Sequence, residues 1–341
     1  MSIGRTFLRR VASVLGVVVL ALVMLGSWPV WVVGTVVFDV VRRKWKLPTL
    51  RLVAFGLCWA WIEVGGLVAA LLFFLAGQGK NLTVHFALQR WWAGTLMAAL
   101  RATVGIRVVV ENPEVLTPGP VLVFSRHASL ADSLVSAYSM GNAAGLRPRY
   151  VLKRELNADP CLDIVGHRLP NYFLDRGSNN QAEELKGIAQ LGHDLGPNDV
   201  AVIFVEGTRA NPKKREKILA SMAERSPERA GRLAALRHLL PPKPAGALTL
   251  LDAAPDADVV IAGHTGFDGL DTFGGMLRQL EAGAGVARMW FVRIPRSEVP
   301  TDGVIEWLDE RWLDLDRAVA DHLQRGGSRT KPATTTGEEH G

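Results

Sequence analysis

The chain has 341 residues, of which 48% are hydrophobic, and it carries a formal net charge of +6. This basic and apolar-rich composition favours anionic partners such as lipid headgroups or phosphorylated substrates. Its two cysteines, Cys58 and Cys161, exclude a disulfide framework. Because the chain has no zinc-finger spacing and no RNA-binding signature, we expect no nucleic acid partner.

Two long apolar segments occupy the N-terminal part of the chain. Residues 11–41 contain one charged residue, Asp39, and residues 52–77 contain one, Glu63. Each segment is longer than the ~20 residues that a helix needs to cross a bilayer. The first is too long for the apolar core of a signal peptide and has no clear cleavage site, so we expect it to be retained. Residues 1–80 are therefore predicted to form membrane-anchoring helices.

The charges around these segments limit their topology. Basic clusters lie before and after the first segment: Arg5, Arg9 and Arg10, then Arg42, Arg43, Lys44, Lys46 and Arg51. Both clusters favour the cytoplasmic side, and two simple crossings cannot place both there. A hairpin broken at Trp28-Pro29 satisfies the rule, while one long tilted helix is the alternative. The sequence leaves monotopic and membrane-spanning arrangements open.

The rest of the chain alternates between helical spacing and short apolar runs. After a helix expected at 82–103, strands are expected at 107–110, 121–124, 150–152, 172–174, 200–205, 259–262 and 289–294. Further helices are expected at about 130–141, 180–195, 212–237, 244–253 and 303–323. This alternation predicts an α/β domain with a mostly parallel sheet over residues 81–325. Residues 326–341 are almost free of apolar side chains and are predicted to be a disordered tail.

A polar group follows the apolar run 121–124, where a strand is expected to end and a helix to begin. In the stretch FSRHASLADS, His127 and Asp132 are five residues apart. A carboxylate on one ring nitrogen holds a histidine in one tautomer, and the other nitrogen can then take a proton from a hydroxyl. An isolated histidine and aspartate near a strand end more often have a structural role. The catalytic interpretation therefore needs support from elsewhere in the chain.

Two further expected strands end in polar turns. VIFVEGTRANPKKREK, residues 202–217, combines a turn-forming glycine, a hydroxyl and the guanidinium of Arg209, which suit a phosphate. The later cations of this stretch are equally typical of a solvated helix start. In NYFLDRGSNN, residues 171–180, Arg176 follows a third run. If the three turns meet at one sheet edge, they bring together a base, its orienting carboxylate and cations for an anion.

The order of these motifs resembles the 1-acyl-glycerol-3-phosphate acyltransferases, a family of glycerolipid acyltransferases. His-x4-Asp, then Phe-Leu-Asp-Arg, then Phe-Val-Glu-Gly-Thr-Arg match in order and spacing over roughly residues 85–265. LLPPKPAGAL, residues 239–248, resembles more loosely a fourth family block. One departure is Arg126, because many members have asparagine directly before the histidine. This cation could bind phosphate or lower the basicity of His127.

The resemblance implies a glycerolipid acyltransferase-like fold and a role for each matching residue. His127 would be the general base and Asp132 its orienting carboxylate. The resemblance implies that a further group of residues binds substrate: Arg176, Glu206, Gly207, Thr208, Arg209 and, in the fourth block, Pro242 and Lys243. Arg126, which departs from the family pattern, is expected as an additional substrate-binding residue. The donor would be a thioester, acyl-CoA or acyl carrier protein. No covalent enzyme intermediate, cofactor or metal is expected.

The expected reaction is acyl transfer to the free hydroxyl of 1-acyl-glycerol-3-phosphate, which gives phosphatidate for phospholipid biosynthesis. Alternatives within the class are another lysophospholipid or a glycolipid as acceptor. Alternatives outside it are a non-catalytic lipid-binding membrane scaffold and a hydrolase that activates water. Because the composition is rich in Ala, Gly and Arg, we expect a bacterial plasma (inner) membrane with the catalytic domain facing the cytoplasm.

Overall fold

A seven-stranded sheet forms the centre of the protein, which we describe from a computed structural model over residues 3–129, 131–175, 177–178, 180–267, 273–282 and 285–328. The strands are β1 (Arg107–Val110), β2 (Val121–Ser125), β3 (Arg147–Lys153), β4 (Tyr172–Leu174), β5 (Asp199–Ile203), β6 (Asp258–Thr265) and β7 (Val286–Ile294). Their order across the sheet is β1-β7-β6-β2-β5-β3-β4. Neighbours pair in parallel, except β6 with β7. The predicted mostly parallel α/β fold is confirmed.

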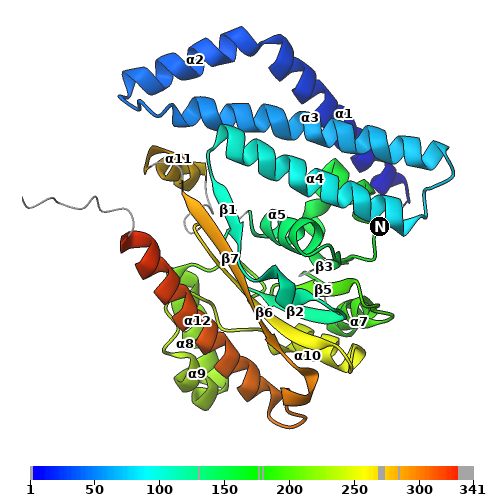
Figure 1. The fold of residues 1–341 in the computed structure, drawn as a ribbon, viewed down its shortest axis with the longest axis vertical. Coiled ribbons are helices and arrows are strands. Elements are labelled where there is room, and N and C mark those ends of the chain that lie inside the picture. The colour runs from blue at the N-terminus through cyan, green and yellow to red at the C-terminus, as the bar shows by residue number, and fades with distance from the viewer. Residues whose placement is uncertain are drawn as a thin grey trace, which may run out of the picture.

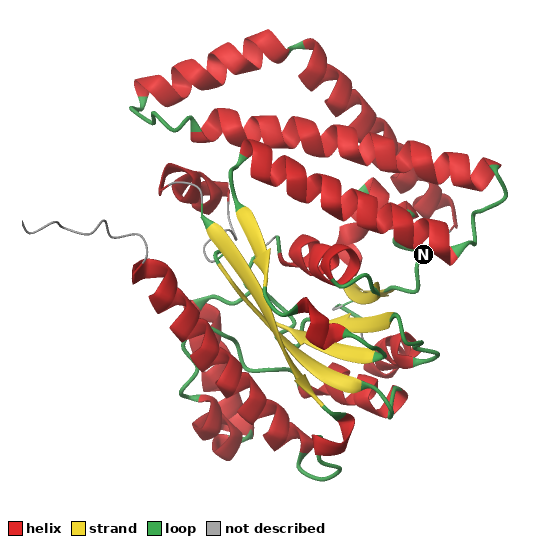
Figure 2. Cartoon of the chain, in the orientation of Figure 1, coloured by secondary structure: helices red, strands yellow, loops and turns green. Residues whose placement is uncertain are grey.

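Helices surround this sheet on both faces (Figure 2). In chain order they are α1 (Ile3–Gly26), α2 (Trp28–Val41), α3 (Pro48–Leu75), α4 (Leu82–Thr103), α5 (Asp132–Ala137), α6 (Pro160–Ile164), α7 (Gln181–Gly192), α8 (Pro212–Arg225), α9 (Pro227–Leu233), α10 (Pro244–Ala253), α11 (Phe273–Ala282) and α12 (Val304–Ser328). A π-helical turn, Tyr138–Ala143, continues α5.

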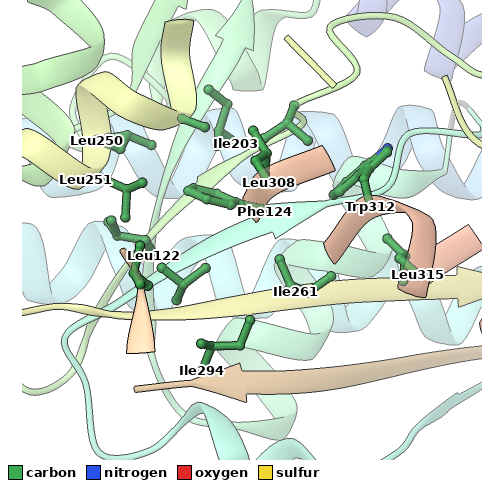
Figure 3. Packing of buried hydrophobic residues seen from close by; sticks show 14 of the residues in the cluster. Leu122, Phe124, Ile203, Leu250, Leu251, Ile261, Ile294, Leu308, Trp312 and Leu315 are labelled. Carbon is green, nitrogen blue, oxygen red and sulfur yellow. The ribbon is translucent and has the colours of Figure 1, made fainter. Parts of the chain in front are cut away.

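Alternate residues of the central strands pack on opposite faces, as the two-residue period of a strand requires. Leu122 and Phe124 of β2 pack with Leu250 of α10 and Trp312 of α12 on one face (Figure 3). On the other face, Val121 and Val123 of the same strand lie in a cluster with residues of α4 and α5. Both faces of the sheet are therefore covered, which explains why its strands read as continuous apolar runs.

The N-terminal helices form a further layer outside α4 (Figure 1). The first apolar segment breaks at Ser27, directly before Trp28-Pro29, so the predicted break is confirmed. The buried carboxylate of Asp39 accepts hydrogen bonds from Thr49 N at 2.9 Å and Leu50 N at 3.2 Å, and so caps α3. Two helical segments, Gly4–Gly26 and Pro48–Leu75, are long and apolar enough to cross a membrane.

Seven expected strands and the helices at 82–103 and 244–253 agree with the structure. The expected helix at 212–237 is instead two helices, α8 and α9, because Pro227 cannot continue the hydrogen bonding of α8. Helix α12 reaches Ser328, past the predicted start of the tail. The rest of the predicted tail lies outside the described residues. The division at residue 80 stays a prediction.

Candidate active site

The loops after three adjacent strands meet at one edge of the sheet. Strands β2, β5 and β3 are neighbours and run in parallel, so their carboxyl ends share that edge. The loop after β2 carries His127, the loop after β5 carries residues 206–209, and β3 ends at Lys153. Ligands of open α/β sheets commonly bind outside the carboxyl ends of the strands. The predicted convergence is therefore observed for the turns after β2 and β5, whereas the third predicted turn, after β4, contains Arg176, which lies outside the described residues.

His127 and Asp132 form a buried pair at this edge. The Nδ1 atom of His127 lies 2.8 Å from Oδ2 of Asp132. The same carboxylate oxygen accepts hydrogen bonds from Ala128 N at 2.6 Å and Ser129 N at 2.8 Å. The hydroxyl of Ser129 donates to Oδ1. The carboxylate is thus fixed by its own loop, and Nε2 is the ring nitrogen left for a reacting hydroxyl.

The surroundings of Asp132 keep its carboxyl ionised. Burial by itself would raise the pKa of this group. The nearby His264, the hydrogen bond and charge of His127 and the Ser129 hydroxyl outweigh burial, and they lower the pKa of Asp132 to about 2. An ionised carboxylate at Nδ1 stabilises the imidazolium that forms when His127 takes a proton.

The buried carboxyl of Glu206 connects the loop that contains His127 with the segment that contains Leu240. Its Oε1 accepts a hydrogen bond of 2.7 Å from His127 N, and its Oε2 accepts one of 2.9 Å from Leu240 N. Complete burial raises the pKa of Glu206 to about 8, although these bonds and the charge of Arg126 act in the opposite direction. Glu206 therefore positions the backbone of His127.

Gly207 allows Lys243 to approach the turn. The glycine has φ of +69°, a left-handed conformation that other residues rarely adopt. A Cβ atom at this position would lie 3.0 Å from Cδ and 3.2 Å from Nζ of Lys243. The Lys243 backbone is also held, because its N–H donates to Val205 O at 2.8 Å. The third and fourth sequence blocks thus contact each other directly.

A pocket of about 380 Å³ opens beside the pair. Its charged lining includes Lys153, Arg209, Lys243 and Glu184. Glu184 also accepts hydrogen bonds from Tyr172 Oη and Asp175 N. The remaining wall contains His127 and Ser129 and a group of apolar side chains: Val151, Leu152, Leu156, Leu174, Leu185, Ile188, Ile203, Phe204 and Val205. One pocket thus combines a histidine base, several cations and an apolar wall.

Comparison with known proteins identifies the domain. Residues 107–263 match the family model Acyltransferase. The chain carries an acyltransferase-family domain. A stretch of 106 residues is 29% identical to a protein named probable 1-acyl-sn-glycerol-3-phosphate acyltransferase from Mycoplasma pneumoniae, and covers 31% of this chain and 39% of that protein's length. The crystal structure of the 1-acyl-sn-glycerophosphate acyltransferase PlsC from Thermotoga maritima aligns with a TM-score of 0.43 and 13% identity, over 80% of this chain and 97% of that one.

The other predicted site residues of the acyltransferase domain have different positions. Arg126 is 2% exposed, and its guanidinium donates to the backbone oxygen of His264, so its side chain points into the protein. Thr208 accepts a hydrogen bond of 3.4 Å from Lys214 Nζ outside the pocket lining. Arg209 and Lys243 line the pocket, and their role in substrate binding stays a prediction. Arg176 lies outside the described residues.

The structure adds residues that the motifs of the acyltransferase domain did not indicate. Lys153 lines the pocket and is the last residue of the strand that contains Tyr150–Leu152, so a cation directly after an apolar run was the available signal. Ser129 holds Asp132 from within the five-residue spacing. Over the residues that the structure describes, no three His, Cys, Asp or Glu side chains gather as metal ligands.

Proposed function

We propose that this acyltransferase moves an acyl chain from a thioester to the free hydroxyl of 1-acyl-glycerol-3-phosphate, which gives phosphatidate. The observation that carries the proposal is the His127–Asp132 pair at the wall of a pocket that is both cationic and apolar. The name of the Mycoplasma pneumoniae relative supports the choice of acceptor.

In the proposed reaction, His127 first accepts a proton and later returns it. Nε2 of His127 accepts the proton of the acceptor hydroxyl while its oxygen bonds to the thioester carbonyl carbon. The resulting tetrahedral intermediate breaks its carbon–sulfur bond, and the imidazolium returns the proton to the leaving thiolate. Asp132 stabilises the imidazolium in between, so no covalent acyl-enzyme is required.

The pocket lining suits an anionic lipid. Lys153, Arg209 and Lys243 provide cations for the phosphate of the acceptor, and a guanidinium is able to contact two phosphate oxygens at once. The apolar wall suits a hydrocarbon chain. The donor is proposed as acyl-CoA or acyl carrier protein, since both present an acyl thioester.

We propose further that α3 lies along the membrane surface. Its first turn is tied to the catalytic domain through Arg51, whose side chain donates to Thr103 O at 2.9 Å. In its middle, Glu63 accepts a hydrogen bond of 2.7 Å from Trp92 Nε1, and near its end Ala70 O accepts one of 2.8 Å from Arg168. From residue 51 to 70 a helix extends about 28 Å, close to the ~30 Å of a hydrocarbon core. Because α3 is attached to a polar domain over that length, the part of the helix that remains is too short to cross the bilayer.

The exposed apolar side chains support the same placement. Most of the large ones lie on α1, α2 and α3, including Leu15, Val23, Val33 and Leu72. A monotopic anchor of this kind would let the acceptor reach the pocket from the leaflet in which it resides. For a bacterial protein we propose the inner membrane, with the catalytic domain in the cytoplasm.

The test uses membranes that contain the full chain or its His127→Ala variant, supplied with acyl-CoA and 1-acyl-glycerol-3-phosphate. Free thiol and phosphatidate are followed together, and we expect both only with the parent. Thiol without acyl-lipid would indicate a hydrolase. If a panel of lysophospholipid and glycolipid acceptors gave no product with folded protein, a lipid-binding scaffold would replace the proposal.

A further inference from the structure

A second histidine lies against the carboxylate that holds His127. His264, near the end of β6, is 2% exposed, and its Nε2 lies 3.4 Å from Oδ1 of Asp132. His127 contacts the other oxygen, Oδ2, at 2.8 Å. The carboxylate of Asp132 therefore lies between two imidazole rings, although the two histidines are 137 positions apart in the chain.

Contacts at its backbone and at its ring fix His264 beside Asp132. Strand β6 pairs in parallel with β2, and the register places Ala262 beside Ser125, the last residue of β2. The backbone oxygen of His264 accepts a hydrogen bond from the guanidinium of Arg126, directly before His127. The rings of His264 and Phe267 also meet edge to face, with centroids 6.3 Å apart. His264 is thus held at its backbone and at its ring.

We propose that His264 is a positioning residue of the acyl transfer reaction, which holds and partly neutralises Asp132 from the side opposite His127. This inference rests on the proposed function. His264 is not part of the pocket lining, so it acts on the substrates through Asp132 and His127. Among the residues that the structure describes, the charged groups that face it are Asp132 on α5 and Arg126 after β2, with Glu206 beyond Arg126, and uncharged Met289 is its partner on β7.

The electrostatic consequence has a definite sign. An N–H group or a positive charge at His264 partly neutralises the negative charge of Asp132. When His264 is absent, the full carboxylate charge acts on His127 and favours the imidazolium. Replacement of His264 by phenylalanine should therefore move the acid limb of the pH–rate profile to higher pH. It should also lower kcat, because Asp132 loses one of its fixed contacts.

The experiment compares His264→Phe with His264→Gln, whose amide N–H reaches toward the same carboxylate oxygen. We expect His264→Phe to lower kcat roughly tenfold. The KM for either substrate should change little, because the lost interaction stabilises the transition state and not substrate binding. His264→Gln should recover most of the rate and the parental acid limb. The matched control is His322→Phe, because His322 Nε2 lies 3.6 Å from a carboxylate oxygen of Glu111, which directly follows the edge strand β1.

A second readout is independent of turnover. Diethylpyrocarbonate modifies neutral imidazole, and mass spectrometry of the peptide that contains His127 gives its rate of modification against pH. We expect the midpoint of that curve to rise in His264→Phe and to stay unchanged in His322→Phe. If this shift appears in a protein without acyl transfer, the proposed function fails while the coupling of the histidines stands. An unchanged midpoint, or equal losses of kcat in the Phe and Gln variants, would overturn the inference.

Discussion

The Oε1 atom of Glu206 lies 2.7 Å from the backbone nitrogen of His127. A completely buried carboxyl from the loop after β5 therefore holds the main chain of the proposed base in the loop after β2. This relationship links the acid–base chemistry of the site to the stability of the fold.

The stability of the domain should depend on the protonation of Glu206. The pKa of this carboxyl is raised to about 8 in the folded protein, from an ordinary value of 4.5. Between these two values the folded chain retains a proton that the unfolded chain releases. The free energy of unfolding should therefore fall as the pH rises from 5 to 8, by up to about 1.4 kcal/mol per pH unit from this group. Denaturant unfolding of the parent and of Glu206→Gln checks this. The Gln variant should lose this part of the slope, and equal slopes would contradict the expectation.

Removal of the charge of Asp132 should abolish most of the activity. Asp132→Asn no longer stabilises an imidazolium at His127, and we expect kcat to fall about 10²- to 10⁴-fold. The control is Asp316→Asn, because Asp316 also accepts several backbone hydrogen bonds, from residues 237–239, away from the pocket. That change should lower the melting temperature but leave turnover per folded molecule intact. Near-parental turnover in Asp132→Asn would remove the pair from the mechanism.

The close contact between Gly207 and Lys243 should make this glycine irreplaceable. Gly207→Ala adds strain of about 1–2 kcal/mol from its positive φ and pushes the Lys243 side chain away. We expect lower stability together with a raised KM for the anionic acceptor. Gly145→Ala is the matched control, because Gly145 has φ of +71° and no atom within 4 Å of its added Cβ. If both variants changed KM alike, the contact with Lys243 would have no part in binding.

Arg209 should act on the acceptor more than on the donor. Arg209→Ala removes a pocket cation, and we expect KM for 1-acyl-glycerol-3-phosphate to rise about tenfold, as for a lost hydrogen bond to a charged group. The KM for the acyl donor should change much less. Arg225→Ala, at the exposed end of α8, controls for net charge. Equal increases for both substrates would argue against a phosphate role for Arg209.

The placement of α3 along the membrane predicts that both of its ends are on one side. One cysteine is added at a time, in a Cys58→Ala background that keeps only the buried Cys161. Lys46→Cys and Gln78→Cys flank this helix, and Glu224→Cys on α8 marks the catalytic side. A membrane-impermeant maleimide should label all three positions in inverted vesicles and none in sealed right-side-out vesicles. Labelling of the Lys46 and Gln78 positions from opposite sides would show a crossing.

The fold was predictable because its signals are local. Each strand of the double-covered sheet is a short apolar run with polar ends, and Trp28-Pro29 marks the break between α1 and α2. Helix α11 was missed because its two glycines obscure a helical pattern. The expectation of one helix over 212–237 was wrong because it overlooked another local signal, Pro227, which begins α9.

The site was predictable only to the level of motifs. Sequence spacing indicated His127 and Asp132 as a pair. It does not show whether a side chain in a turn points into the pocket or into the protein interior. Glu206 was expected to shape the acceptor site, yet its carboxyl is buried against the backbone of His127. The contact of His264 with Asp132 depends on strand order, because β6 lies beside β2 although its residues come much later in the chain.

The pairing of α1 with α6 also sets an order of events during synthesis. Arg9 and Arg10 of α1 both contact the buried carboxylate of Asp163, which lies 154 residues after Arg9. The first helix therefore leaves the ribosome long before its partner exists. Helices α2 and α3, with which α1 packs, are made before α6, so the N-terminal helices are able to assemble first and the ion pairs with Asp163 form afterwards.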